Sequence, residues 1–321
     1  MAYQPASNVT TTATLRHQVA TYYNRKALDQ LTAMFYFQSA GEPDILPLRN
    51  GKSVQYFRYD LLGSNTTPTS EGVVGTGLQL STNTVSATVS EYDDYASGST
   101  LLRDTAIDDI AANFAEQLGY RAALSVDIIA RTELDSLSST TNIATIGANG
   151  TSADLRRAKA LLNGVNVRPK EGGDFMGIMH PYVRFDILSD NAAGGFIDVM
   201  RYSQPEVAMT GEIGKVEGVR LVQTTNVATD GVAAPNTKYT TYVIGKGAMG
   251  VIALAGNGPS KVTDIQKQSF QINVVSGGRA SIPDPTGKIG FIVSYRFVFV
   301  AKLLDTTTPR FKTIPMDSSI I

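Results

Sequence analysis

The feature that most constrains the fold of this chain is one long amphipathic run between residues 104 and 137. Apolar or small side chains recur there every three or four residues, as in a helix that buries one face. Thr105 and Asp108 form a candidate capping box, and Asp108 and Asp109 favour a helix N-terminus. About thirty residues at roughly 1.5 Å each span about 45–50 Å. The run therefore predicts a long spine helix whose core face carries Ile107, Ile110, Phe114, Leu118 and Ile129.

Residues 45–98 are predicted to form an extended β-hairpin loop. Ser53–Tyr59 is rich in strand-forming residues, and Thr84–Ser90 alternates apolar and hydroxyl side chains with period 2. A two-stranded ribbon is marginal by itself, so we expect the loop to lie against a neighbouring subunit. The residues predicted to serve this inter-subunit loop are Tyr56, Tyr59, Val85 and Val89 as side chains to bury, and Gly63, Gly72, Gly75 and Gly77 as hinges.

The remaining segments alternate helix and strand signals. Thr151 and Asp154 form a second capping box, which opens a helix that ends at Asn163-Gly164. His180-Pro181 places proline at the first turn of another helix. The expected strands are Phe175–Met179, Val219–Thr224, Tyr239–Ile244 and Ile289–Leu304. The sequence thus divides into an arm (1–44), the extended loop (45–98), the spine-helix segment (99–150), an α/β segment (151–275) and a returning strand (276–321).

Composition excludes several classes of function. The net charge is −1, which provides no basic field for nucleic acid, so any contact with DNA is expected to be weak and non-specific. Cysteine is absent, which excludes disulfides and thiolate sites. The opening stretch lacks the charged and apolar regions of a signal peptide. The most apolar stretch, Gly290–Leu304, contains Arg296 and Lys302, so no membrane association is expected.

Two glycine motifs resemble nucleotide sites but favour turns. Gly245–Gly250 reads G-x-G-x-x-G after a predicted strand, yet strand-like residues follow it instead of the helix that must bind a pyrophosphate. Gly172–Phe175 resembles part of a cyclase signature but contains a single carboxylate. We interpret both as turns, and no cofactor is expected.

Catalytic residues are not indicated either. The two histidines, His17 and His180, are far apart in sequence, and His180 suits a strand end or a helix cap. The acidic pairs Asp93-Asp94 and Asp108-Asp109 fall at a predicted strand end and helix start, where solvated carboxylates are common. The chain is therefore expected not to be an enzyme and to bind no metal.

An ordered set of segments resembles the coat family of podophage N-four, a family of tailed-bacteriophage major capsid proteins. The segments that carry the resemblance are Leu46–Arg58, Thr66–Gly72, the helix from Thr105, His180–Asp190, Gly211–Thr225 and Pro283–Lys302. Together they span most of residues 30–304. One departure is Phe291 after Gly290, where the family usually has tryptophan.

The resemblance implies the α+β Hong Kong-type capsid fold. In that fold, residues 99–150 and the return strand of 276–321 would form a peripheral domain, and residues 151–275 an axial domain. It also implies pentamers and hexamers of an icosahedral shell around double-stranded DNA, with a portal and decoration proteins as further partners. Assembly would take place in the host bacterial cytoplasm and the product would be the virion capsid. The alternative is another β-rich structural protein, such as an adhesin or a tail component.

Overall fold

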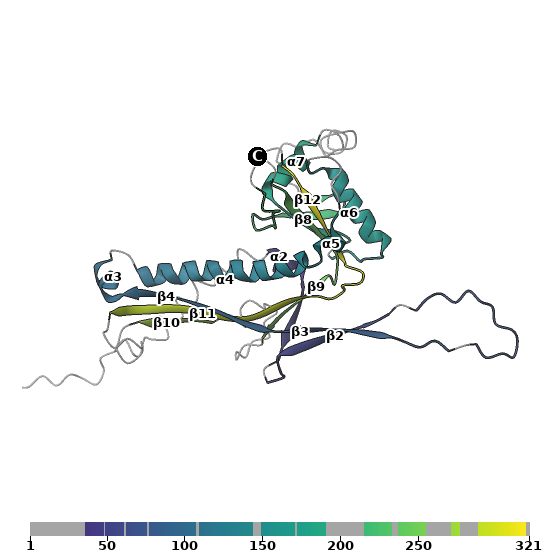
Figure 1. The fold of residues 1–321 in the computed structure, drawn as a ribbon, viewed down its shortest axis with the longest axis horizontal. Helices are drawn as coiled ribbons and strands as arrows, with labels where there is room; N and C mark the ends of the chain where they lie inside the picture. Colours follow the sequence, from purple (N-terminus) through teal and green to yellow (C-terminus); the bar gives the residue numbers. More distant parts are fainter. Residues whose placement is uncertain are drawn as a thin grey trace, which may run out of the picture.

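The computed structural model describes residues 36–47, 49–60, 62–75, 77–106, 109–143, 149–170, 172–190, 215–232, 237–254, 271–276 and 288–318. Two β-sheets, one long helix and a projecting ribbon make up this part of the chain (Figure 1). The first sheet and the long helix extend to one side, the ribbon extends to the other, and the second sheet lies above them. Among the described helices, none has the length and apolar character needed to cross a membrane.

The first sheet is organised around one 15-residue strand, β11. Arg296 lies opposite both Asp93 and Gln271, so its neighbours occupy both edges. One edge pairs with β4, and the other pairs in succession with β10 and β9, all antiparallel. β1 then pairs with β9 in parallel. The strands are β1 (Glu42–Leu46), β4 (Ser90–Ser99), β9 (Met249–Leu254), β10 (Gln271–Ser276) and β11 (Ile289–Leu303).

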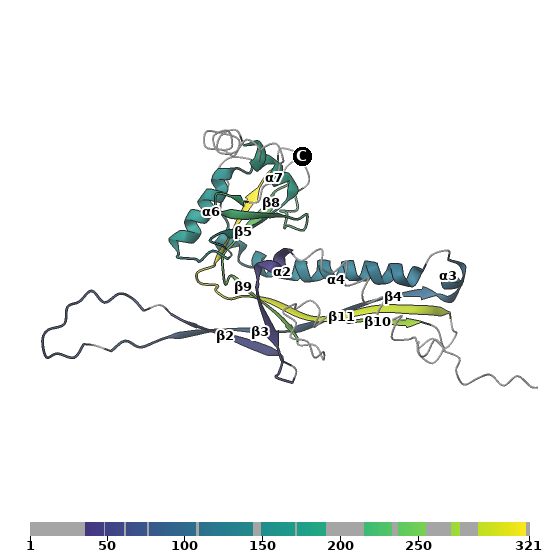
Figure 2. The same ribbon diagram turned by 180° about the vertical axis from the view of Figure 1, so that it is seen from behind.

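The helix α4 (Ile110–Asp135) runs along this sheet and buries one side of it (Figures 1 and 2). Every second side chain of β11 from Phe291 to Leu303 is buried, as expected where only one face of a strand meets a helix. Phe114 packs against Phe291 with ring centroids 5.5 Å apart. The strand predicted over Ile289–Leu304 is thus confirmed, and Phe291 is a core residue.

The predicted start of the spine helix is wrong. A short helix, α3 (Thr100–Thr105), ends first, and Ala106 adopts an extended backbone that interrupts the run. The cap of α4 is Asp109, whose carboxylate accepts a hydrogen bond from the Ala112 amide at 3.2 Å. Thr105 instead donates its hydroxyl to the Leu101 carbonyl at 2.7 Å. α4 is therefore 26 residues long, or about 39 Å; Ile107 and Asp108 lie outside the described residues.

The second sheet has the order β12-β8-β5-β7-β6. Its strands are β5 (Phe175–Met179), β6 (Lys215–Val216), β7 (Val219–Gln223), β8 (Tyr239–Ile244) and β12 (Phe311–Met316), and the nearby helices are α5 (Ser138–Thr141), α6 (Ser152–Gly164) and α7 (Pro181–Ser189). The capping residues predicted for α6 are confirmed, because the Thr151 amide donates to the Asp154 carboxylate at 3.1 Å. His180 caps α7 by accepting from the Tyr182 amide at 3.2 Å.

The sheets do not follow the segment boundaries drawn from sequence. β9 falls inside 151–275 yet pairs in the first sheet, and β12 follows β11 yet pairs in the second. β4 falls inside the expected loop but pairs with β11 along its length. Asp93 and Asp94 are accordingly inside a strand, not at its end, and Asp94 forms an ion pair with Arg121 at 2.7 Å. Neither β4 nor β12 was expected as a strand from the sequence, and strand propensity does not identify the partner of a strand.

A buried polar network joins α4 to the second sheet. The Asp127 carboxylate accepts hydrogen bonds from the Phe37 amide and the Asn226 side-chain amide, both at 2.8 Å. Phe37 belongs to α2 (Tyr36–Ala40), and its ring meets Tyr242 of β8 edge-on at 5.0 Å. Tyr242 donates its hydroxyl to Asp135 at the end of α4 at 2.6 Å. Burial raises the pKa of Asp127 above its ordinary value, although both hydrogen bonds oppose this. The network fixes the second sheet on the spine helix.

Candidate inter-subunit surfaces

The ribbon consists of β2 (Ser53–Tyr59) and β3 (Thr82–Thr88), and it projects from the body of the molecule (Figures 1 and 2). The pairing is antiparallel, with Tyr56 opposite Val85. Where the paired strands end and the tip begins, the Asp60 amide donates to the Ser81 carbonyl at 3.1 Å, and the Ser81 hydroxyl donates to the Asp60 carboxylate at 2.6 Å. The expected hairpin is confirmed, and backbone hydrogen bonds flank the paired strands at both ends.

One face of the ribbon is anchored to its own chain. Tyr56, Val54 and Val89 pack beside the small buried cluster of Leu46, Ala87 and Ile252. The Tyr56 hydroxyl donates to Asp44 at 3.1 Å. Burial and the neighbouring Asp44 charge raise the pKa of Tyr56 well above its ordinary value. Tyr56 and Val89 therefore have intramolecular partners, and Val85 is half-buried.

Arg58 links the ribbon to the turn after β11. Its guanidinium forms an ion pair with Asp305, whose side chain is only 3% exposed. The same carboxylate accepts from the Thr307 amide at 3.1 Å, and from the Thr308 amide and hydroxyl at 2.9 and 2.6 Å. Burial raises the pKa of Asp305, but the hydrogen bonds from Thr308 and the Arg58 charge outweigh it and hold the pKa below its usual range. The ribbon thus leaves the body at a fixed point.

The opposite face and the tip of the ribbon expose apolar side chains. Phe57 is 66% and Tyr59 is 62% exposed, because they alternate with the anchored Tyr56 and Arg58. Tyr56 and Tyr59, both predicted as side chains for a neighbouring subunit to bury, are three residues apart and so point to opposite faces of the ribbon. Exposed apolar side chains also follow in the tip: Leu62, Val73, Val74, Leu78 and Leu80. Exposed apolar side chains gathered on one projecting element suit a protein interaction surface.

The tip glycines differ in what they require. Gly72 has φ +80° at a turn, a conformation that favours glycine. Gly63, Gly75 and Gly77 have no such φ, and an added Cβ at Gly63 or Gly77 would meet nothing within 4 Å. Of these four positions, only Gly72 has a backbone conformation that requires glycine within one subunit. The hinge role assigned to the four glycines stays a prediction.

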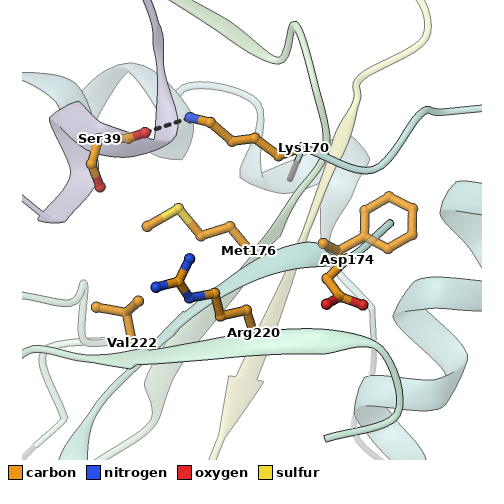
Figure 3. Close-up of a pocket in the computed structure, with 7 residues that line it drawn as sticks. Ser39, Lys170, Asp174, Met176, Arg220 and Val222 are labelled. Carbon is orange, nitrogen blue, oxygen red and sulfur yellow. Dashed lines mark hydrogen bonds between the residues drawn. The ribbon is translucent and has the colours of Figure 1, made fainter. Parts of the chain in front are cut away.

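A separate hollow of about 250 Å³ lies beside β5 and β7, next to the end of α2 (Figure 3). Lys170 donates its ammonium to the Ser39 carbonyl and, at 3.1 Å, to the Gly41 carbonyl, which satisfies the end of α2. Ser39 donates its hydroxyl to the Tyr36 carbonyl at 2.7 Å. Asp174 pairs with Lys215 at 2.6 Å. These groups hold the fold together and form no nucleophile–base pair.

The other singled-out motifs also have structural roles. The motif Gly245–Gly250 forms the turn that leads from β8 into β9 and ends inside β9, which begins at Met249, so the turn interpretation is confirmed. Gly172 and Gly173 form the turn before β5 with φ of +57° and +90°. His180 stacks on Tyr239 with centroids 4.2 Å apart, and burial lowers its pKa. His17 lies outside the described residues, as do the arm residues 1–35.

Comparison with known proteins places this architecture. No protein-family model matches the sequence, and no curated protein matches it either. The capsid structure of the cyanophage P-SCSP1u superimposes with a TM-score of 0.65 at 14% identity, covering 89% of this chain and 88% of that chain. The capsid of Ralstonia phage GP4 gives 0.64 at 13%, covering 89% and 91%. The holo-SrpI encapsulin complex from Synechococcus elongatus PCC 7942 gives 0.51 at 11%, covering 90% of both.

The likeness covers 89% of this chain and about nine tenths of each of the two phage capsid chains. At sequence identities this low, the structural likeness establishes the fold. The chain therefore has the α+β Hong Kong-type capsid fold found in tailed-bacteriophage major capsid proteins.

Proposed function

We propose that this chain is a major capsid protein, which assembles through copies of itself into an icosahedral shell. The observation that carries the proposal is the ribbon. It is fixed at its root by Tyr56 and Arg58, yet it exposes Phe57, Tyr59 and the apolar tip residues to solvent. A monomer gains nothing from an arm of this kind, whereas a neighbouring subunit would bury it.

The contact between ribbon and neighbour joins two different surfaces. Such head-to-tail contacts close into rings when the rotation between copies allows it, and pentamers and hexamers of one sequence close a shell. The capsid fold of the compared phage proteins supports this reading over an adhesin or a tail component.

The virion context follows from the same proposal. The enclosed genome is double-stranded DNA, touched weakly because the net charge is −1. Portal and decoration proteins are the further partners, assembly takes place in the host bacterial cytoplasm, and the role is structural, not enzymatic.

Expression of the full chain and electron microscopy of the purified protein test the proposal. Closed shells built from rings of five and six are expected, and light scattering should report a large particle. Monomers or dimers at every concentration would contradict it.

A further inference from the structure

A basic hollow lies at the root of the ribbon, and we call it the root pocket. Its volume is about 730 Å³, and four different parts of the chain supply its cations. These are Arg58 of β2, Arg168 before β5, Lys246 in the β8–β9 turn and Arg310 before β12. Val165 and Tyr59, 49% and 62% exposed, add apolar surface at the same hollow.

The cations of the root pocket exceed its carboxylates. Arg58 pairs with Asp305, and the Arg310 Nε lies 4.0 Å from the same carboxylate. Glu42 accepts from the Gly247 amide at 3.2 Å. Arg168 and Lys246 are exposed, and within the described part of the chain their side chains make no ion pair. The positive charges of Arg168 and Lys246 are therefore available to bind an anionic group.

The tip of the ribbon carries such a group. Glu71 is the sole charged residue between Leu62 and Ser81. It is exposed, and it makes no ion pair with any residue that the structure describes. Val73 and Val74, 62% and 94% exposed, follow it closely. The tip thus pairs one carboxylate with apolar side chains, which matches a basic pocket with an apolar rim.

Tip and pocket of one chain cannot meet in this arrangement. The ribbon runs away from the body (Figures 1 and 2), and the twelve Cα–Cα steps from Tyr59 to Glu71 can span up to about 40 Å. A second copy must supply the other half of the pair. Because the two surfaces differ, the contact is head-to-tail, the type that forms rings when the rotation between copies closes.

We infer that Glu71 of one copy binds the root pocket of the adjacent copy, between Arg168 and Lys246. The inference rests on the proposed shell function, and it names the residues that set the register between subunits. Each exposed ion pair is weak by itself, but it recurs at every contact of a ring, and a like charge in its place repels.

Charge reversal in the full chain tests the pairing. Glu71→Lys should abolish closed shells, and so should Arg168→Glu combined with Lys246→Glu, with melting temperatures unchanged because all three side chains are exposed. The three substitutions in one chain should restore shells. Gln79→Lys, which adds the same charge to the same tip, is the control and should assemble normally.

Mixing the two reversed proteins gives a second readout. Neither protein should assemble alone, because its tip and its pocket carry the same sign of charge. Where the two proteins alternate in a ring, each tip meets a pocket of opposite charge. Rings of six can alternate perfectly and rings of five cannot, so electron microscopy of a one-to-one mixture should find rings of six without closed shells. Normal shells from Glu71→Lys alone, or a mixture no different from its components, would overturn the inference. Failure of the unmodified chain to form shells would instead overturn the proposed function.

Discussion

Asp305 shows how much can depend on one turn residue. It is buried in the link between the two sheets, and it binds the backbone of Thr307 and Thr308 and the guanidinium of Arg58 from the ribbon. A carboxylate with several donors around it stabilises the fold only while it is ionised.

We predict that Asp305→Asn lowers the free energy of unfolding by about 1–3 kcal/mol at neutral pH. The folded-state pKa of Asp305 lies below its unfolded value of 3.8, so its contribution is present above that value and is lost as the pH falls through the folded pKa. Denaturant titrations should therefore find the two proteins converging below about pH 3.8. Glu71→Gln, at an exposed site, serves as the control with no such pH dependence. A constant difference across this range would contradict the assignment.

Some of these residues were predictable from the sequence and others were not, for a physical reason. His180, Thr151 and Asp154 were predictable because capping is a local interaction. Asp305 was not singled out, since its partners lie in β2 and in its own turn, and one of them is almost 250 positions away. The cations of the root pocket are likewise scattered over the sequence and meet only in the fold.

At the scale of elements, α4 buries a stripe that is shifted from the predicted face but still includes Leu118. Leu118 is buried, whereas Ile110, Phe114 and Ile129 are half-buried at the margin of the core. The centre of the stripe consists largely of small residues with no exposed surface: Ala115, Ala122, Ala123 and Ala130. A helix that lies close against a sheet needs small side chains at the contact. Because alanine is only weakly hydrophobic, a hydrophobicity pattern does not single it out as a core residue.

We predict that Phe114→Asp destabilises the protein by at least about 3 kcal/mol, because it removes the ring that packs on Phe291 and places a charge beside the core. Tyr120→Asp, which introduces the same residue into the same helix at a 40% exposed position, should cost far less. Thermal denaturation of both variants measures the difference. Equal melting temperatures would show that the ring contributes nothing to stability.

The body should fold without the tip of the ribbon. Replacing residues 61–80 with Asn-Gly joins Asp60 to Ser81 through a two-residue hairpin turn and leaves their hydrogen bonds possible. Circular dichroism should find the variant folded, and electron microscopy should find no shells. Normal shells would show that the tip is not an assembly element, and unfolded protein would show that the body depends on it.

At the scale of the whole molecule, charge limits contact with nucleic acid. With a net charge of −1, DNA binding depends on scattered cations, and it should weaken steeply as salt displaces them. Filter-binding or fluorescence anisotropy titrations between low and physiological salt should show affinity falling with no dependence on DNA sequence. A salt-resistant, sequence-selective complex would contradict this expectation.

The position of β11 also governs when the molecule can form during synthesis. This strand holds the first sheet together, and its partner β4 precedes it by almost two hundred residues. When only the ribbon and the spine helix have left the ribosome, the sheet that the helix covers has not yet been synthesised. The buried residues that anchor the ribbon are missing as well. Contacts this distant in sequence form slowly and late. Nascent chains that stop before residue 289 therefore lack β11 and the completed first sheet.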